Sequence, residues 1–174
     1  MKISCLETSR LFLVPSSMKY FEERSSISSD IENTRLMMFL PSTKEETFSY
    51  IKKCETQWKS ENQTLFEFDI LLKEENNKFI GGISFELLFD NPEIVKKFGN
   101  NCADMGWLLD KNFWNKGFAS ESAKCVLEFT KSLGVKKMIA QCDAENIGSW
   151  RVMEKIGMKK YSDNGIRYNK SEPN

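Results

Sequence analysis

The chain has 174 residues, of which 40% are hydrophobic and 29% charged, and its 25 basic side chains balance its 25 acidic ones. This composition predicts one globular domain, 1–174, and excludes a disordered chain, while the lack of a basic stripe argues against nucleic-acid binding. No apolar run reaches the roughly 18 residues that span a bilayer, and Met1–Arg10 lacks the pattern of a secretion signal. We therefore expect a cytoplasmic protein with no nucleic-acid or membrane partner.

In chain order, the first predicted element is a short strand at Ser9–Val14. The segment 18–40 predicts helices that a serine-rich loop, 25–30, interrupts. Ser42 and Glu45 have the spacing of a capping box, and apolar residues at helical spacing follow them. The first part of the chain is therefore expected to be one strand followed by helices.

Two predicted strands come next and are expected to pair in antiparallel fashion. Thr64–Leu72 alternates apolar and acidic residues, which predicts a half-buried strand, and 74–77 has the composition of a turn. Phe79–Phe89 supplies the partner strand, in which Gly81 and Gly82 predict a bulge or a close approach of the backbone.

After a polar excursion at 91–101, the pattern predicts strand, loop, helix, strand, helix and strand. The bounds are Ala103–Leu109 for the strand, Ala119–Leu133 for the helix with Gly134 as its C-cap, Met138–Cys142 for the next strand, a short helix capped by Asn146, and Met158–Tyr161 for the last strand. This order predicts a mixed α/β fold, with helices on the faces of one sheet.

The chemistry available to this chain is limited by what it lacks. It has no histidine, which excludes Ser-His and Cys-His nucleophilic systems and most catalytic zinc sites, so no metal is expected. Its five cysteines are widely spaced and odd in number, which favours reduced thiols. Catalysis must then rely on carboxylates, hydroxyls, backbone dipoles and a reactive substrate.

The glycine loop before the second long helix is the most informative motif. In Trp114-Asn115-Lys116-Gly117-Phe118-Ala119-Ser120, a glycine that can adopt a positive φ stands at the start of a helix. Main-chain N–H groups that converge there, together with the helix dipole, form an anion-binding site. The alternative is an ordinary turn before a helix, and the loop alone does not decide between the two.

Three blocks together resemble the GCN5-related N-acetyltransferase (GNAT) superfamily, and within it the RimJ/RimL-like ribosomal-protein N-terminal acetyltransferases. The blocks are Glu7-Thr8-Ser9-Arg10-Leu11-Phe12-Leu13, then 103–121 with its strand, glycine loop and helix, and Asn146 to Met158, which has the N-x-x-S-x-x-x-x-E-K-x-G-[FM] pattern. Three features depart from the branch: Val14 where arginine is usual, Met153 where many superfamily members have a tyrosine acid, and no clear terminal hairpin in Ser162–Asn174.

The resemblance implies a mostly antiparallel central sheet that splays at its middle, with helices on both faces, and acetyl-CoA as co-substrate. The pyrophosphate of the cofactor is expected on the main-chain N–H groups of 116–120, and its amide-rich arm in the gap between the strands at 105–109 and 138–142. A main-chain N–H near Leu108 is then the expected oxyanion donor, and Asn146 a ligand of the arm or simply a helix N-cap. The residues expected at the cofactor are Leu108, Leu109, Trp114, Asn115, Lys116, Gly117, Phe118, Ala119, Ser120, Cys142, Asn146 and Ser149.

Two residues are candidates for proton transfer. Asp104 stands where the branch commonly has a glutamate and is the candidate base, acting through water, although it could instead be a surface carboxylate or an ion-pair partner of Arg10. Ser149 is the candidate that returns a proton to the cofactor sulfur, although it could instead be a small packing residue. Glu121 is expected to complement the helix dipole. A base matters most for lysine-like amines, whose deprotonation at pH 7 costs about 4–5 kcal/mol, against about 1 kcal/mol for an α-amine.

The predicted activity is acetyl transfer from acetyl-CoA directly to a primary amine, without a covalent enzyme intermediate. The acceptor is a protein N-terminus or a small amine, and the acidic residues Glu22, Glu23, Asp30 and Glu32 could favour a polyamine or aminoglycoside. The alternative is a CoA-binding regulator or sensor that has lost turnover. The protein is expected to act as a monomer or a homodimer.

Overall fold

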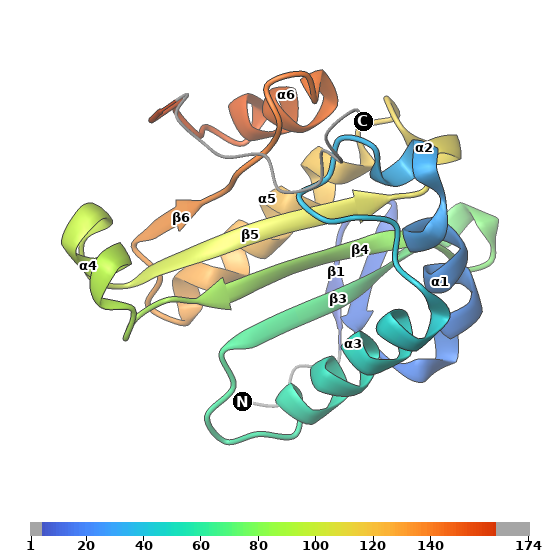
Figure 1. The fold of residues 1–174 in the computed structure, drawn as a ribbon, viewed down its shortest axis with the longest axis horizontal. Coiled ribbons are helices and arrows are strands. Elements are labelled where there is room, and N and C mark those ends of the chain that lie inside the picture. The colour runs from blue at the N-terminus through green and yellow to red at the C-terminus, as the bar shows by residue number, and fades with distance from the viewer. Residues whose placement is uncertain (1–4, 163–174) are drawn as a thin grey trace, which may run out of the picture.

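The computed structural model describes residues 5–162. Its framework is a six-stranded sheet with the order β1-β2-β3-β4-β5-β6, in which all neighbours are antiparallel except β5 and β6 (Figure 1). The strands are β1 (Leu6–Glu7), β2 (Leu11–Pro15), β3 (Leu65–Leu72), β4 (Lys78–Leu87), β5 (Cys102–Leu109) and β6 (Lys137–Ile139). The predicted mixed α/β fold is confirmed.

Six α-helices accompany the sheet in the described part of the chain. They are α1 (Phe21–Ser29), α2 (Ile31–Thr34), α3 (Lys44–Gln57), α4 (Pro92–Phe98), α5 (Phe118–Ser132) and α6 (Ile147–Lys155). In the view of Figure 1, α5 lies behind the sheet, and the segment between α2 and α3 crosses in front of it. No helix among residues 5–162 combines the length and apolar character that crossing a bilayer requires.

The main hydrophobic core lies between α5 and one face of the sheet. Period-2 alternation along β3 places Phe66, Phe68 and Ile70 on this face, where the ring of Phe129 from α5 lies about 6 Å from those of Phe66 and Phe68. The acidic residues of β3 therefore point to the other face. That face is covered as well, so all eight residues of β3 are buried, and the prediction of a half-buried strand is wrong.

The glycine pair in β4 behaves as predicted. Its register with β3 shifts between Ile70 and Leu71, which is the irregularity of a bulge. Gly81 has φ +146° there, and a Cβ at this position would overlap the carbonyl oxygen of Leu108 on β5. Gly81 thus allows β4 and β5 to approach closely beside the candidate site.

Several predicted bounds were wrong because local contacts decided between competing patterns. The capping box belongs to Thr43 and Glu46, one residue later than expected, since Thr43 Oγ1 accepts from Glu46 N and Thr43 N donates to Glu46 Oε2. The serine-rich segment 25–30 is helical to Ser29, and the break falls at Asp30, whose side chain caps α2.

In the C-terminal half, two predicted strands were too long or absent. β6 ends at Ile139, so Cys142 lies beyond the strand in which it was placed. Met158–Tyr161 forms no strand, and within 91–101 a short helix, α4, replaces the expected loop. Of Ser162–Asn174, where the sequence shows no clear terminal hairpin, 163–174 lies outside the described residues.

Candidate active site

The candidate site lies on the face of the sheet opposite α5. The strand registers align three rows of side chains across β3, β4 and β5: Leu65–Glu86–Asp104, Glu67–Ser84–Gly106 and Asp69–Gly82–Leu108. The middle positions of the second and third rows are small, and the positions that flank them on β3 are acidic. A polar face with little side-chain volume at its centre leaves space above the strands.

That space is a cavity of about 890 Å³. Its walls come from the sheet, from α1 and α3, from the segment that joins α2 to α3, and from the start of α6. Five of the predicted site residues line it together: Asp104, Leu108, Cys142, Asn146 and Ser149. The structure therefore brings together residues from two segments, 104–108 and 142–149, that are far apart in the sequence.

The sheet opens beside this cavity. β6 pairs with β5 only over the first three residues of β5, up to Asp104 and Ile139, and β5 then continues to Leu109 paired with β4 alone. Among residues 5–162, no strand pairs with this side of β5 beyond Asp104. The predicted splay is confirmed, and it leaves an edge to which an extended, amide-rich chain can add as a strand does.

The register also decides which main-chain groups point into this gap. Asp110 N donates to Ile80 O and Leu88 N to Cys102 O, which fixes the alternation of the antiparallel β4–β5 ladder. By that alternation the N–H of Leu108 faces β4, whereas those of Trp107 and Leu109 face the gap. The main-chain N–H groups near Leu108 that face the gap are therefore those of Trp107 and Leu109, and the ladder register that decides this has no signal in the sequence.

The glycine loop has the backbone conformation that an anion site needs. Gly117 is the N-cap of α5 with φ +83°, and Asn115 has φ +60°. Gly117 offers no side chain to cap the first N–H groups of the helix, those of Phe118, Ala119 and Ser120, which have no intrahelical acceptor. The loop follows β5 and lies outside the lining of the cavity.

The side chains of the loop differ in their surroundings. The exposed Trp114 donates from Nε1 to Leu109 O at 2.9 Å, which ties the loop to the end of β5. Lys116 is exposed, and its ammonium lies 5.1 Å from the ring centre of Phe113. Leu109, like the loop, does not line the cavity.

Glu121 holds the glycine loop against β2, a role that the sequence analysis missed. Its carboxylate accepts hydrogen bonds from Thr8 Oγ1 at 2.5 Å, Arg10 N at 3.0 Å and Arg10 Nε at 2.7 Å. Arg10 also donates to Lys116 O and stacks over Phe118. Partial burial by itself would raise the pKa of Glu121, but these hydrogen bonds lower it. The pairing of Arg10 with Glu121 removes the alternative in which Arg10 pairs with Asp104.

We expect Glu121→Gln to weaken coenzyme A binding by about 10-fold. The variant loses the charge-assisted hydrogen bonds that hold the loop, which lowers the binding free energy by roughly 1–2 kcal/mol. Glu128→Gln is the matched control, since Glu128 lies on the same helix in an exposed pair with Lys131. Isothermal titration with coenzyme A measures both. Equal affinities for the two variants would contradict the anchoring role.

Asp104 is the only cavity-lining aspartate among the described residues, and its environment is unusual. Burial raises its pKa to about 6, the N–H of Met105 opposes the shift, and the neighbouring carboxylate of Glu86 adds to it. A carboxylate with a pKa near the working pH can both accept and release a proton, as a general base must. The half-buried position also excludes the simple surface carboxylate considered from the sequence.

Asn146, Ser149 and Cys142 form the α6 side of the cavity. Asn146 is the N-cap of α6, with Oδ1 accepting from Ser149 N at 3.0 Å, and its Nδ2 donates to Leu36 O at 3.2 Å. One amide hydrogen of Asn146 remains for a ligand after these contacts. Burial raises the pKa of the Cys142 thiol, with Asp143 adding to the effect, so it is a poor nucleophile.

A buried ionic cluster, not foreseen from the sequence, forms the other end of the cavity. Arg24 of α1 pairs with Glu67 at 2.8 Å and with Asp69 at 2.6 Å, and Tyr50 donates to Glu67 at 2.7 Å. A Cβ on Gly82 would lie 2.5 Å from a Glu67 oxygen and 2.6 Å from Arg24. The alternation of acidic and apolar residues in β3 was the available signal, but it was read as solvent exposure.

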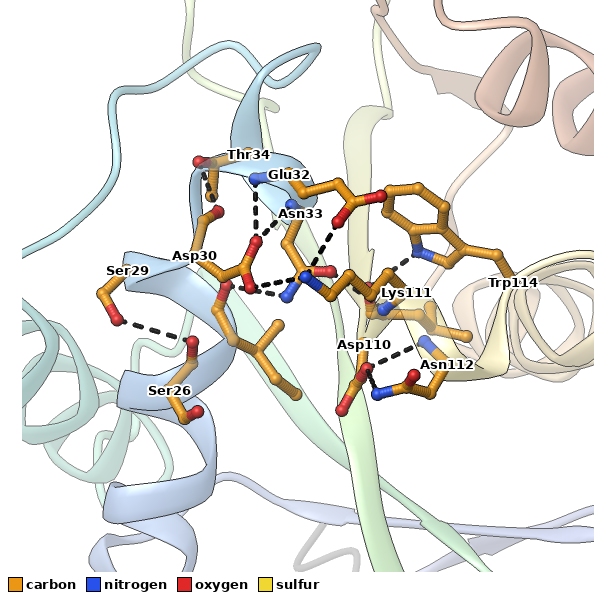
Figure 2. A network of polar contacts seen from close by, with 12 residues as sticks. Ser26, Ser29, Asp30, Glu32, Asn33, Thr34, Asp110, Lys111, Asn112 and Trp114 are labelled. Atoms are coloured by element: carbon orange, nitrogen blue, oxygen red, sulfur yellow. Dashed lines mark hydrogen bonds and ion pairs between the residues drawn. The ribbon is translucent and has the colours of Figure 1, made fainter.

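Figure 2 shows a second polar network, which joins α2 to the segment after β5. Lys111 Nζ lies 2.8 Å from both Asp30 and Glu32, and Lys111 N donates to Asn33 Oδ1 at 2.8 Å. The two carboxylates raise the pKa of Lys111, which in turn lowers that of Asp30. The network fixes α2, and with it the start of the segment that covers the cavity.

The fold, the splayed sheet and the uncapped glycine loop define a class of acyltransferase, and the comparisons with known proteins agree. The acetyltransferase (GNAT) domain family matches residues 10–159. The chain is 30% identical over 144 residues to the uncharacterized N-acetyltransferase YnaD of Bacillus subtilis, covering 80% of this chain and 75% of that protein. The chain therefore belongs to the GNAT acetyltransferase family and is an acetyltransferase.

Solved structures show the same fold. A GNAT-family acetyltransferase from Bacillus anthracis matches with a TM-score of 0.73 and 28% identity, over 91% of this chain and 85% of that one. RimL, a ribosomal L7/L12 α-N-protein acetyltransferase solved in complex with coenzyme A, matches with a TM-score of 0.72 and 15% identity, over 88% of this chain and 82% of that one. At that identity the second match speaks for the fold alone.

Proposed function

We propose that this protein transfers the acetyl group of acetyl-CoA directly to a primary amine, as a RimJ/RimL-like N-acetyltransferase. The observation that carries the proposal is the open edge of β5 beyond Asp104, which leads from the glycine loop to a cavity that holds a carboxylate with a raised pKa. Membership of the acetyltransferase (GNAT) family supports the choice of an acetyl donor.

The cofactor fits residues of this chain. The N–H groups of 116–120 at the start of α5 suit a diphosphate, because the positive end of the helix dipole and a glycine N-cap lie there. The open edge of β5 suits the amide-rich arm, with Asn146 as a further donor. When bound, acetyl-CoA supplies a thioester whose carbon–sulfur bond breaks as the amine nitrogen bonds to the acetyl carbon.

The residues of the chain divide the proton transfers between the two sides of the cavity. Asp104, through water, takes a proton from the acceptor ammonium, a task for which a pKa of about 6 suits it at neutral pH. Ser149 holds a proton at Oγ on the α6 side, where the leaving sulfur needs one. No covalent enzyme intermediate is required, in keeping with the raised pKa of the Cys142 thiol.

The proposal is tested in two steps with the purified chain. Titration with coenzyme A should give saturable binding, which Gly117→Val, by forcing a branched side chain to φ +83°, should weaken by at least about 10-fold. A panel of amines with acetyl-CoA should then give acetylated product. Tight binding without transfer to any amine would favour the non-catalytic sensor, and no binding would overturn both functions.

Ser149→Ala is expected to lower kcat by about 10–100-fold, a larger effect than any on coenzyme A affinity, because a lost proton donor acts mainly on the reaction. Steady-state kinetics on the best amine measures the effect. Ser132→Ala is the control, because Ser132 is the exposed last residue of α5 and does not line the cavity. This variant should leave kcat unchanged. Full activity in Ser149→Ala would remove this residue from the proton path.

A further inference from the structure

The cavity has one wall that is wholly apolar. Leu36, Met37, Met38 and Phe39, four consecutive residues of the segment between α2 and α3, all line it. Three of them are half-buried, and the two methionines can adjust to ligands of irregular shape. The segment is held at its start by the α2–Lys111 network and by the hydrogen bond from Asn146 to Leu36 O, and at its end by the hydrogen bond from Ser42 N to Ser28 O. A fixed apolar wall beside a reaction site indicates an apolar part in the ligand.

The charges of the cavity leave room for one ammonium group. Of the four carboxylates that line it, Glu67 is bound by Arg24 and Tyr50, and Glu46 accepts from Thr43 N in the capping box. Glu86 and Asp104 remain, paired in register across β4 and β5, and neither forms an ion pair within residues 5–162. Lys53 also lines the cavity and would repel a second ammonium, whereas the charge of Arg24 is already taken up by Glu67 and Asp69.

The acidic residues that could have favoured a polycation are engaged elsewhere. Glu22 pairs with Lys44, and Asp30 and Glu32 pair with Lys111 (Figure 2). None of these, nor Glu23, lines the cavity. Beyond Glu86 and Asp104, the cavity therefore offers a polyamine or an aminoglycoside no further carboxylate that is not already held by Arg24 or by the capping box, among the described residues.

We infer that the acceptor is a monoamine whose amine is attached to an apolar group. The ammonium lies over Asp104 and Glu86, and the apolar group packs on Leu36–Phe39. A small hydrophobic amine and a peptide N-terminus with an apolar first side chain share this chemistry. The inference rests on the proposed function and specifies the substrate class of the same cavity.

The test compares kcat/KM across four kinds of acceptor with acetyl-CoA as donor: 2-phenylethylamine, a peptide that begins with leucine, a peptide that begins with aspartate, and the polycations spermidine and kanamycin. We expect the first two to exceed the polycations by at least about 10-fold, and the leucine peptide to exceed the aspartate peptide likewise, because one well-placed apolar group discriminates by about 10–200-fold. The ratio of 2-phenylethylamine to the leucine peptide distinguishes a free amine from a peptide.

The wall is tested with two variants of the same segment. Met38→Ser should raise KM for the better apolar acceptor by about 10-fold and leave coenzyme A affinity unchanged, because it removes apolar contact only from the acceptor side. Leu40→Ser is the matched control, since Leu40 is 60% exposed and does not line the cavity, and it should change neither value.

The outcomes separate the inference from the proposed function. Acetylation that favours spermidine, kanamycin or the aspartate peptide would overturn the inference and leave the acetyltransferase standing. Equal KM values for Met38→Ser and Leu40→Ser would overturn it as well. Coenzyme A binding with no transfer to any amine would overturn the proposed function, and the inference with it.

Discussion

Asp104→Asn is expected to lower kcat/KM by about 10²–10³-fold, because general-base catalysis of this kind contributes roughly that much. In the wild-type protein the acid limb of the kcat/KM profile should rise with pH and bend near pH 6, the value to which burial raises the pKa of Asp104. In the variant this bend should disappear. Asp90→Asn, at an exposed aspartate outside the cavity, is the control and should keep both rate and profile.

The same substitution should make the fold more stable at neutral pH. A carboxyl whose pKa is raised on folding binds its proton more tightly in the native state, so unfolding free energy falls as pH rises from about 4 to about 6. Relative to Asp104→Asn, the wild-type protein should lose about 1–3 kcal/mol of unfolding free energy over this pH range. Urea denaturation of both proteins at pH 4 and pH 7 measures the difference. A variant that is inactive and also less stable at pH 7 would point to a structural role.

The second large effect is expected at the buried cluster. Arg24→Met should lower the unfolding free energy by about 3–5 kcal/mol, because it leaves two carboxylates buried without their cation. The side chains of Arg24, Glu67 and Asp69 are only 12%, 4% and 1% exposed. Burial, followed by the charge of Glu67, raises the pKa of Asp69, while Arg24 opposes the shift, so removal of Arg24 should protonate the cluster.

The control for this prediction is Lys44→Met, which removes the cation of an exposed pair in which both side chains are at least 64% exposed. This substitution should lower the unfolding free energy by no more than about 1 kcal/mol. A triple variant, Arg24→Met with Glu67→Gln and Asp69→Asn, should recover much of the lost stability, since the charges are then removed together. Equal losses of unfolding free energy for Arg24→Met and Lys44→Met would show that the buried cluster stabilises the fold no more than an exposed ion pair does.

The agreement between sequence and structure is best where the signal is local. Gly117 before an amphipathic helix predicted a positive φ and a helix start, and both were found because glycine accepts that conformation without strain. The alternation in β3 predicted the strand and its core face. It did not predict what covers the other face, since an acidic residue at a period-2 position fits solvent and a buried cation equally well.

The sequence alone was enough to predict most of the strands and helices, the glycine loop and the family. Periodicity, capping chemistry and backbone freedom act within a few residues, so their signals can be read locally. Tertiary structure alone decided three things: that Glu121 anchors the loop to β2, that Arg24 neutralises β3, and that the N–H of Leu108 faces β4. Each depends on residues far apart in the chain or on the register of a strand ladder. The type of one side chain does not indicate which distant group it will contact.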